Sequence, residues 1–263
     1  MFMNILHAII LGIVEGITEF LPVSSTAHME FAAHAMRIMQ TDFVKSFLIV
    51  VQLGAILAVA ILYRRRLLTS WKTWRNIVIG FIPTGILGFA LYKLVKGFLL
   101  GNVWLAAAML IIGGIVILIV ESRTKERLHA EVAASIEDLS VGNMLLLGVI
   151  QAVAVVPGVS RSGALIVGGR LMHIPRKVIV EAAFLLALPT MAAAAGYDLL
   201  KTGIAFSGNE WWVLLVGTVV SCVVAYVAAS WLISYVSRAG FKVFGWYRIV
   251  AGVVLLVAFF LGL

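Results

Sequence analysis

Residues 5–28 read ILHAIILGIVEGITEFLPVSSTAH, and this stretch decides the fold. Its apolar part, Ile5–Phe20, is 16 residues long. A helix of that length extends about 24 Å, whereas the hydrocarbon core of a bilayer is about 30 Å thick. A proline and a serine-rich turn follow, before a second short helical segment. This order predicts a re-entrant helix–loop–helix unit rather than a membrane span.

A second stretch of the same kind lies in the other half of the chain. Residues 141–163 read VGNMLLLGVIQAVAVVPGVSRSG, again a short apolar run followed by proline and a turn rich in serine and glycine. Residues 11–18 align with residues 147–154, and Pro22–Ser25 aligns with Pro157–Ser160 after a one-residue slip. The two stretches are therefore predicted to be copies of one re-entrant unit.

Six further apolar runs are long enough to cross a bilayer, which takes about 20 residues. They cover residues 43–63, 77–98, 103–121, 177–199, 211–235 and 246–263. Three of them follow each re-entrant unit, and an odd number of spans inverts the second copy, as in many transporters. The sequence therefore predicts an all-α polytopic membrane protein with an inverted-topology repeat. Its single membrane domain has halves 1–121 and 140–263, joined by a polar linker, 122–139.

The composition of the 263 residues agrees with this class and excludes others. Apolar residues make up 63% of the chain and charged residues 12%, about half of the ~25% usual in soluble domains. Mean hydropathy is +1.11. These values exclude a soluble globular enzyme, a disordered chain and a coiled coil. The single cysteine, Cys222, excludes a disulfide framework.

The net charge of +8 is predicted to set membrane topology rather than to bind nucleic acid. Lysine and arginine divide 14 to 5 between the two predicted sides, and the richer side is assigned to the cytoplasm. Its basic residues are Arg64, Arg65, Arg66, Lys72, Arg75, Arg123, Lys125, Arg127, Arg170, Arg176, Lys177, Arg238, Lys242 and Arg248. Both termini and the mouth of the first unit then face outward, and the two re-entrant tips are expected to meet near mid-membrane.

The first unit carries two carboxylates, and ionisable groups inside a membrane are candidates for function. Glu15 and Glu19 are four residues apart, so both point to one face of a helix. Two adjacent carboxylates repel unless one is protonated or a cation lies between them. A divalent cation with oxygen ligands, Mg²⁺ or Ca²⁺, suits this pair. The alternative is a helix end whose two acids are simply solvated.

Hydroxyl groups follow the carboxylates at the first tip. Ser24, Ser25 and Thr26 come after Pro22 and are suited to cap the next helix. His28 lies three residues after Ser25, so the two side chains are expected to share a helical face as nucleophile and base. Capping alone is the competing interpretation of the three hydroxyls.

The second tip offers the chemistry of an anion site. The guanidinium of Arg161 suits phosphate oxygens, Ser160 and Ser162 add hydroxyls, and Gly163 lets backbone N–H groups approach. Two helix N-termini converging on these tips would also favour an anion. The alternative is that Arg161 only pairs with one of the glutamates. Gln52, polar and mid-span, is expected either to line this site or to bond a neighbouring helix.

The motifs running from Glu15 to His28 and from Pro157 to Gly163 closely resemble those of the undecaprenyl-diphosphate phosphatase family, also called bacitracin-resistance proteins. The resemblance extends along the whole chain. It implies a bacterial inner-membrane enzyme that removes the terminal phosphate of a C55 polyprenyl diphosphate and so recycles the lipid carrier for cell-wall polymers. It also implies an active site that faces the periplasm. Two departures are Ala27, at a position commonly Gly, and Leu165, at a position commonly Thr.

Roles follow from this resemblance together with the residue chemistry. Catalysis is assigned to Glu19, Ser25, His28 and Arg161. Substrate binding is assigned to Ser24, Thr26, Ser160, Ser162, Gly163 and Gln52. Glu15 and Glu19 are assigned to the metal, Mg²⁺ or Ca²⁺. Either Ser24 or Ser25 is the nucleophile, and the choice between a phosphoserine intermediate and direct attack by water stays open.

The expected partners are a polyprenyl diphosphate substrate and membrane lipid, without nucleic acid, and a homodimer is left open. The rival interpretation is a transporter or flippase of a polyprenyl phosphate lipid. The inverted repeat favours that rival, because the architecture is common in transport. Serine and histidine beside a pair of glutamates favour the enzyme.

Overall fold

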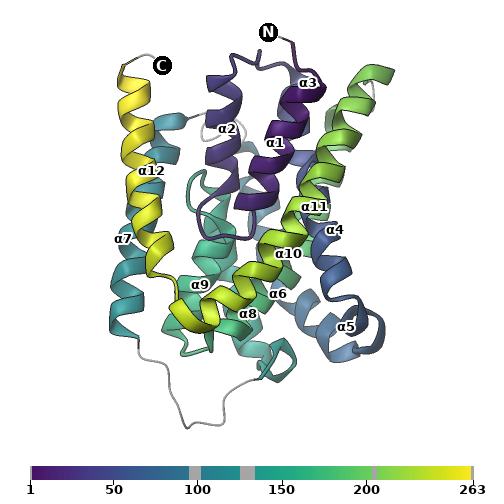
Figure 1. Cartoon of the computed structure of the whole chain (residues 1–263). Helices are drawn as coiled ribbons and strands as arrows, with labels where there is room; N and C mark the ends of the chain where they lie inside the picture. The colour runs from purple at the N-terminus through teal and green to yellow at the C-terminus, as the bar shows by residue number, and fades with distance from the viewer. Residues whose placement is uncertain (1, 95–101, 125–133, 203–205, 262–263) are drawn as a thin grey trace.

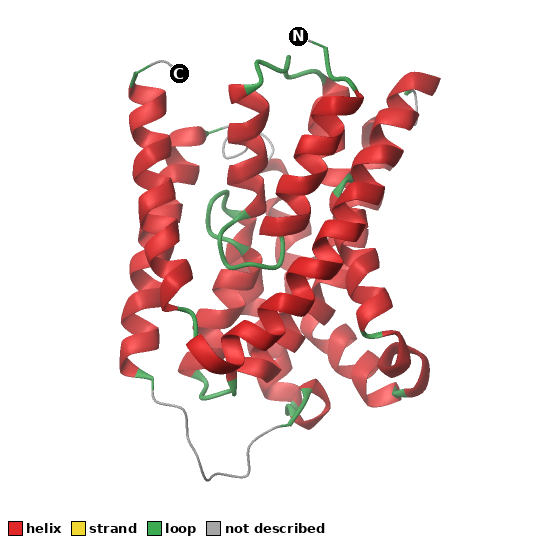
Figure 2. Ribbon diagram, in the orientation of Figure 1, coloured by secondary structure: helices red, strands yellow, loops and turns green. Residues whose placement is uncertain are grey.

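The computed structural model describes residues 2–94, 102–124, 134–202 and 206–261, and within these ranges the chain is helical and has no strand (Figure 2). This confirms the all-α class. The α-helices are α1 Ile5–Thr18, α2 Ser25–Ala35, α3 Asp42–Val50, α4 Gln52–Leu62, α5 Arg64–Thr69, α6 Trp71–Leu94, α7 Val103–Arg123, α8 Val141–Ala152, α9 Arg161–Leu171, α10 Arg176–Thr202, α11 Gly208–Ala239 and α12 Lys242–Phe260. Two 3-10 turns flank α8, η2 Ile136–Asp138 and η3 Val153–Val155.

Six helical segments are long and apolar enough to cross a membrane, which confirms the six predicted spans. They are Asp42–Leu62, Trp71–Leu91, Val103–Arg123, Arg176–Lys201, Gly208–Ala239 and Lys242–Phe260. In four of them, one third or less of the most apolar window is buried inside the protein. Their exposed faces carry large apolar side chains, as expected where a helix meets lipid instead of water. The chain is therefore a multi-pass membrane protein.

Local signals set the ends of the last two helices. Ser207 and Glu210 form a capping box that starts α11, and Gly240, with φ 69°, ends it and permits a sharp turn. Helix α12 then begins at Lys242, four residues before its predicted start. Counting Arg248 among the exposed basic charges of the cytoplasmic side is wrong, because this residue lies inside α12 and is fully buried.

Two helical hairpins enter the molecule from opposite ends (Figure 1). Helices α1 and α2 form one hairpin, which starts at the end where both termini lie and turns about halfway down at residues 19–24. Helices α8 and α9 form the other, which starts at the end where α5 lies. Both turns lie inside the helical bundle, near one another.

The two hairpins share several backbone features at a constant offset, although their first helices end differently. Their matched positions are the helix N-caps Asn4 and Ser140, the left-handed residues Ser24 and Ser160, and the left-handed residues Arg37 and His173. The residue numbers of each pair differ by 136. The predicted one-residue slip is therefore wrong, because Ser24 rather than Ser25 is the counterpart of Ser160. A constant offset is the pattern that two inverted halves would give.

Packing between the halves is reciprocal. The first hairpin packs its helix α1 on α11, and the second packs its helix α8 on α6. A Cβ atom on Gly12 would lie 2.6 Å from the carbonyl oxygen of Gly217, and one on Gly148 would overlap the carbonyl oxygen of Gly80. Gly12 and Gly148 are again 136 positions apart. Each half thus packs against the hairpin of the other half, and glycine at the contact lets the two helix backbones approach closely.

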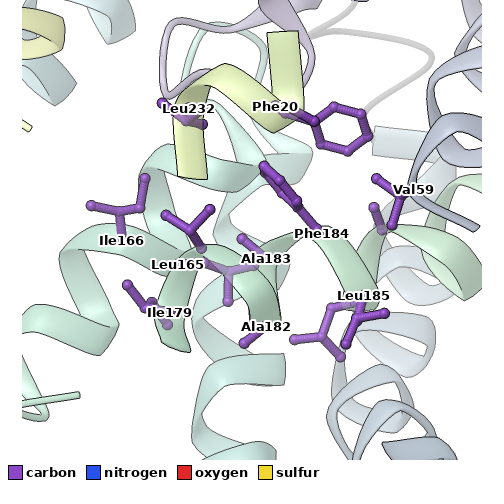
Figure 3. Close-up of a cluster of buried hydrophobic side chains, with 14 of the residues drawn as sticks. Phe20, Val59, Leu165, Ile166, Ile179, Ala182, Ala183, Phe184, Leu185 and Leu232 are labelled. Atoms are coloured by element: carbon purple, nitrogen blue, oxygen red, sulfur yellow. The ribbon is translucent and has the colours of Figure 1, made fainter. Parts of the chain in front are cut away.

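An apolar cluster packs the first turn against α9 and α10 (Figure 3). Phe20 of the first turn packs against Phe184 of α10, with ring centroids 4.7 Å apart. Leu165 of α9 is fully buried in the same cluster. At the position where the resembled family commonly has Thr, this chain therefore fills core space with an apolar side chain.

Ion pairs join helices near the end of the molecule where α5 lies. Glu121 of α7 pairs with Arg170 of α9, at 3.5 Å, and with Arg176 of α10. Arg66 of α5 pairs with Glu181 of α10. Arg66, Arg170 and Arg176 were counted as charges that set topology, and the structure shows that each also holds two helices together.

Candidate active site

The two glutamates occupy the end of α1, where the first hairpin turns. Glu15 lies in the last turn of the helix and is 0% exposed, and Glu19 follows at the C-cap. Neither carboxylate oxygen of Glu15 has a hydrogen-bond partner among the residues that the structure describes. A buried, unsatisfied carboxylate is costly, so this group calls for a proton or a cation.

Glu19 joins the two hairpins. Its Oε1 accepts a hydrogen bond from Nη2 of Arg161, at 3.0 Å, and its Oε2 accepts one from Oγ of Ser25. The other terminal nitrogen of Arg161 donates to the carbonyl oxygen of Ala183, also at 3.0 Å. The structure thus brings Glu19, Ser25 and Arg161 together, and the pairing of Arg161 with a glutamate is part of that cluster.

Hydroxyls of the second tip complete the contact between the turns. Ser162 donates to the carbonyl oxygen of Leu21 in the first turn, at 3.0 Å, and its Oγ lies 3.1 Å from Oγ of Ser160. Ser160 also accepts a hydrogen bond from the N–H of Gly163 and so caps α9. Ser24 holds the matching N-cap position before α2, but its side chain makes no capping bond, so that expectation is wrong.

His28 does not pair with Ser25, contrary to the prediction. Its Nδ1 lies 2.8 Å from the carbonyl oxygen of Ser24, and its Nε2 lies 2.7 Å from the hydroxyl of Tyr247 in α12. The hydroxyl of Ser25 instead donates a hydrogen bond to Oε2 of Glu19. Within this arrangement, Glu19 is the group placed to accept a proton from Ser25.

Arg248 also belongs to the site, although no motif in the sequence indicates it. From α12 its guanidinium reaches the carbonyl oxygens of Pro22, at 3.1 Å, and of Gly158, at 2.8 Å, one in each turn. It also donates to two carbonyls of α7, those of Met109 and Leu110. A fully buried arginine thereby fixes both turns to the same two helices. The available signal was a charged residue inside an apolar run, which marks a site by default.

Three predicted binding residues have different surroundings. Gly163 leaves room for Arg248, because a Cβ atom there would lie 3.1 Å from Nη1 of that guanidinium. Thr26 is half-buried in the first turn of α2, beside Ser25. Gln52 donates to the carbonyl oxygen of Leu48 in its own span, and no hydrogen bond among the described residues joins it to the site.

The donor set is compatible with a divalent cation. Glu15 offers two buried oxygens without partners, and Glu19 lies beside it at the same helix end. In the described part of the chain, no group of three or more His, Cys, Asp or Glu side chains is arranged as a metal site. A cation held here would therefore take further ligands from water or phosphate oxygens, as Mg²⁺ usually does.

The arrangement has the parts needed for chemistry on an anion. It has a hydroxyl bonded to a carboxylate, a guanidinium, and the N-termini of α2 and α9, all at the meeting point of two turns. Helix N-termini and a guanidinium both stabilise negative charge.

Comparison with known proteins gives consistent matches along the chain. A family profile described as "Bacitracin resistance protein BacA" matches residues 8–254. A protein of Aquifex aeolicus named undecaprenyl-diphosphatase is 47% identical over 255 residues, covering 97% of this chain and 98% of that protein. Proteins of the same name from Persephonella marina and Wolinella succinogenes are each 46% identical, and the alignments cover 97% of this chain and 99% and 98% of those proteins.

Proposed function

We propose that this chain, which belongs to the bacitracin resistance protein BacA family, is an integral membrane phosphatase. It hydrolyses undecaprenyl diphosphate to undecaprenyl phosphate and inorganic phosphate, and so recycles the lipid carrier for cell-wall synthesis and confers bacitracin resistance. The observation that carries the proposal is the cluster of Ser25, Glu19 and Arg161, which joins a nucleophile, a base and an anion-binding group across the two turns.

Ser25 is the nucleophile that the hydrogen bonds favour. Glu19 takes the proton of its hydroxyl while Oγ attacks the terminal phosphorus. The bond from that phosphorus to the bridging oxygen breaks, and undecaprenyl phosphate leaves. Water then hydrolyses the phosphoserine and releases phosphate. In the alternative route, Ser25 orients a water molecule that attacks directly, and no covalent intermediate forms.

Charge stabilisation comes from the second hairpin and from helix ends. Arg161 begins α9 and Ser25 begins α2, so both residues lie at helix N-termini. These positive ends and the guanidinium stabilise the negative charge on the phosphoryl oxygens during transfer. Ser24, Thr26, Ser160, Ser162 and Gly163 shape the binding site around the diphosphate. His28 is assigned to proton transfer, either as a base or as an acid toward the leaving group, and an imidazole whose Nε2 only accepts is suited to the role of base.

A divalent cation, Mg²⁺ or Ca²⁺, would be held by Glu15 and Glu19. When bound, it neutralises charge on the phosphate oxygens. Support for this assignment comes from the buried carboxylate of Glu15, whose oxygens have no hydrogen-bond partner in the described chain.

The proposed location is the bacterial inner membrane, with the site open to the outer side. Basic residues such as Arg64, Arg65 and Lys72 lie in α5 and the start of α6, at the end of the molecule opposite the termini, and this favours a cytoplasmic location for that end (Figure 1). The prenyl tail stays in lipid while the diphosphate reaches the two turns, which we propose are re-entrant.

A phosphate-release assay tests the function. Purified protein in detergent micelles is given undecaprenyl diphosphate with Mg²⁺, with Ca²⁺, or with EDTA. We expect phosphate release from the wild type that depends on the cation, and a loss of about 10²-fold or more in the Arg161→Ala variant. No release from a folded wild type, or near-normal turnover in Arg161→Ala, would contradict the proposal.

The rival function, transport of a polyprenyl phosphate lipid, is favoured by the constant 136-residue offset between the hairpins. Reconstituted vesicles with a fluorescent polyprenyl phosphate separate the two functions. Lipid movement that needs no cation and proceeds without phosphate release would favour the rival.

A further inference from the structure

Both ring nitrogens of His28 are occupied by groups of the chain itself. Nδ1 lies 2.8 Å from the carbonyl oxygen of Ser24, and Nε2 lies 2.7 Å from the hydroxyl oxygen of Tyr247. The rings of His28 and Tyr247 are also stacked, with centroids 5.6 Å apart and planes 13° apart. Ser24 and Tyr247 thus set the position, the tilt and the hydrogen bonding of the imidazole.

The chemistry of these neighbours assigns the protons. A carbonyl oxygen only accepts, so Nδ1 of His28 carries a proton and donates it to Ser24. In the neutral ring Nε2 is then the acceptor, and the Tyr247 hydroxyl donates to it. Ser24 and Tyr247 therefore select one tautomer of His28. At reactive sites, the hydrogen-bond partner of one ring nitrogen commonly fixes the tautomer of a histidine in this way.

The place of Tyr247 in the chain makes it a rigid partner. It is 47% exposed, but the next residue, Arg248, is 0% exposed and ties α12 to both turns. Ser24 lies in the first of these turns, immediately before α2. The two groups that bond His28 are therefore fixed relative to each other by a single guanidinium.

We propose that Tyr247 is a positioning residue for the reaction, which holds the His28 imidazole in one orientation and one tautomer through its hydroxyl. This inference rests on the proposed phosphatase function and deepens it. It adds α12 to the elements that determine turnover, although α12 contributes none of the residues assigned from the sequence motifs.

A double-mutant cycle tests the inference in the full-length protein. Tyr247→Phe removes only the hydroxyl, and His28→Ala removes the ring through which Tyr247 acts. With undecaprenyl diphosphate, we expect Tyr247→Phe to lower kcat by about 10-fold with less than a twofold change in KM. The double variant should have the kcat of His28→Ala alone, because Tyr247 then has nothing to position. Unchanged kcat in Tyr247→Phe, or full additivity in the double variant, would overturn the proposal.

A matched variant and a second readout separate this inference from the proposed function. Tyr226→Phe removes the hydroxyl of another half-exposed tyrosine, on α11, and should leave kcat unchanged. The ¹⁵N resonance of His28 Nε2, assigned by its absence in His28→Ala, should shift in Tyr247→Phe and not in Tyr226→Phe. That shift in the ¹⁵N resonance is expected even from a protein that releases no phosphate. If Tyr247→Phe causes no shift, the positioning role of Tyr247 is contradicted, whatever the activity assay shows.

Discussion

Glu19 joins the two hairpins through its carboxylate. One carboxylate oxygen accepts the Ser25 hydroxyl and the other accepts the guanidinium of Arg161, so a single residue links the proposed nucleophile to the anion-binding group. The fully buried Glu15 beside it has no such bonds among the described residues. Glu15 is nevertheless close to the same groups, Ser25 and Arg161. We propose that both carboxylates hold the cation and that Glu19 alone also acts as base.

Glu19→Gln is expected to abolish most turnover. The amide cannot take a proton from Ser25, and it loses the charge that pairs with Arg161. General-base catalysis contributes about 10²–10⁴-fold, so kcat should fall within that range. Phosphate release measures the effect, with Glu137→Gln, in the η2 turn far from the site, as the control variant. A Glu19→Gln enzyme with half of the wild-type kcat would refute the assignment of Glu19 as base.

Arg248→Met is expected to destabilise the protein rather than alter its chemistry directly. The apolar side chain has similar length but offers no donor to the carbonyls of Pro22, Gly158, Met109 and Leu110. Loss of charged hydrogen bonds in a buried site should cost about 3 kcal/mol or more. Thermal unfolding in detergent measures this, with the exposed Arg238→Met as the control. Equal melting temperatures of the two variants would show that the turns do not depend on Arg248.

Residue chemistry predicted some of these contacts and missed others. The meeting of Glu19, Ser25 and Arg161 followed from two short motifs, each compact in sequence. The bond between His28 and Tyr247 spans 219 positions, and no local pattern reports a partner at that separation. The pairing of His28 with Ser25 failed because helical spacing only states which side chains share a face. Which of them bond is decided by neighbours from other helices.

At the scale of helices, close approach between α8 and α6 depends on glycine. Gly148 faces the backbone of Gly80, whereas Gly88, also on α6, has no atom within 4 Å of a Cβ position. Apolar runs sufficed to predict all six spans, because a span needs only length and hydropathy. They did not predict helix ends, since these depend on caps such as the Ser207–Glu210 box.

Two alanine substitutions should have opposite effects. Alanine favours a helix over glycine by about 1 kcal/mol, so Gly88→Ala should leave the melting temperature unchanged or raise it. Gly148→Ala should lower it by several degrees, because the added methyl group pushes α8 away from α6. Thermal unfolding and folded yield in detergent are the measurements. A stabilised Gly148→Ala variant would mean that the two helices can separate without cost.

At the scale of the whole molecule, two opposed hairpins meet between longer helices (Figure 1). The 136-residue offset and the reciprocal packing of α1 on α11 and α8 on α6 are consistent with an inverted repeat. The ends of the molecule differ in charge, and this sets the proposed orientation in the membrane.

Cysteine labelling tests that orientation. In a Cys222→Ser background, Asn102→Cys, just before α7, and Ser70→Cys, just before α6, report opposite ends of the bundle. A membrane-impermeant maleimide should label Asn102→Cys in intact cells and Ser70→Cys only after lysis. The reverse pattern would place the proposed site on the cytoplasmic side.

The position of Arg248 also bears on how the protein is made. Its guanidinium binds a turn that is synthesised near the start of the chain and another that is synthesised beyond its middle. Neither turn can receive these bonds until α12, the last of the described helices, has left the ribosome and entered the bilayer. The nascent protein must therefore keep two polar loops among its helices without these hydrogen bonds until α12 has been inserted.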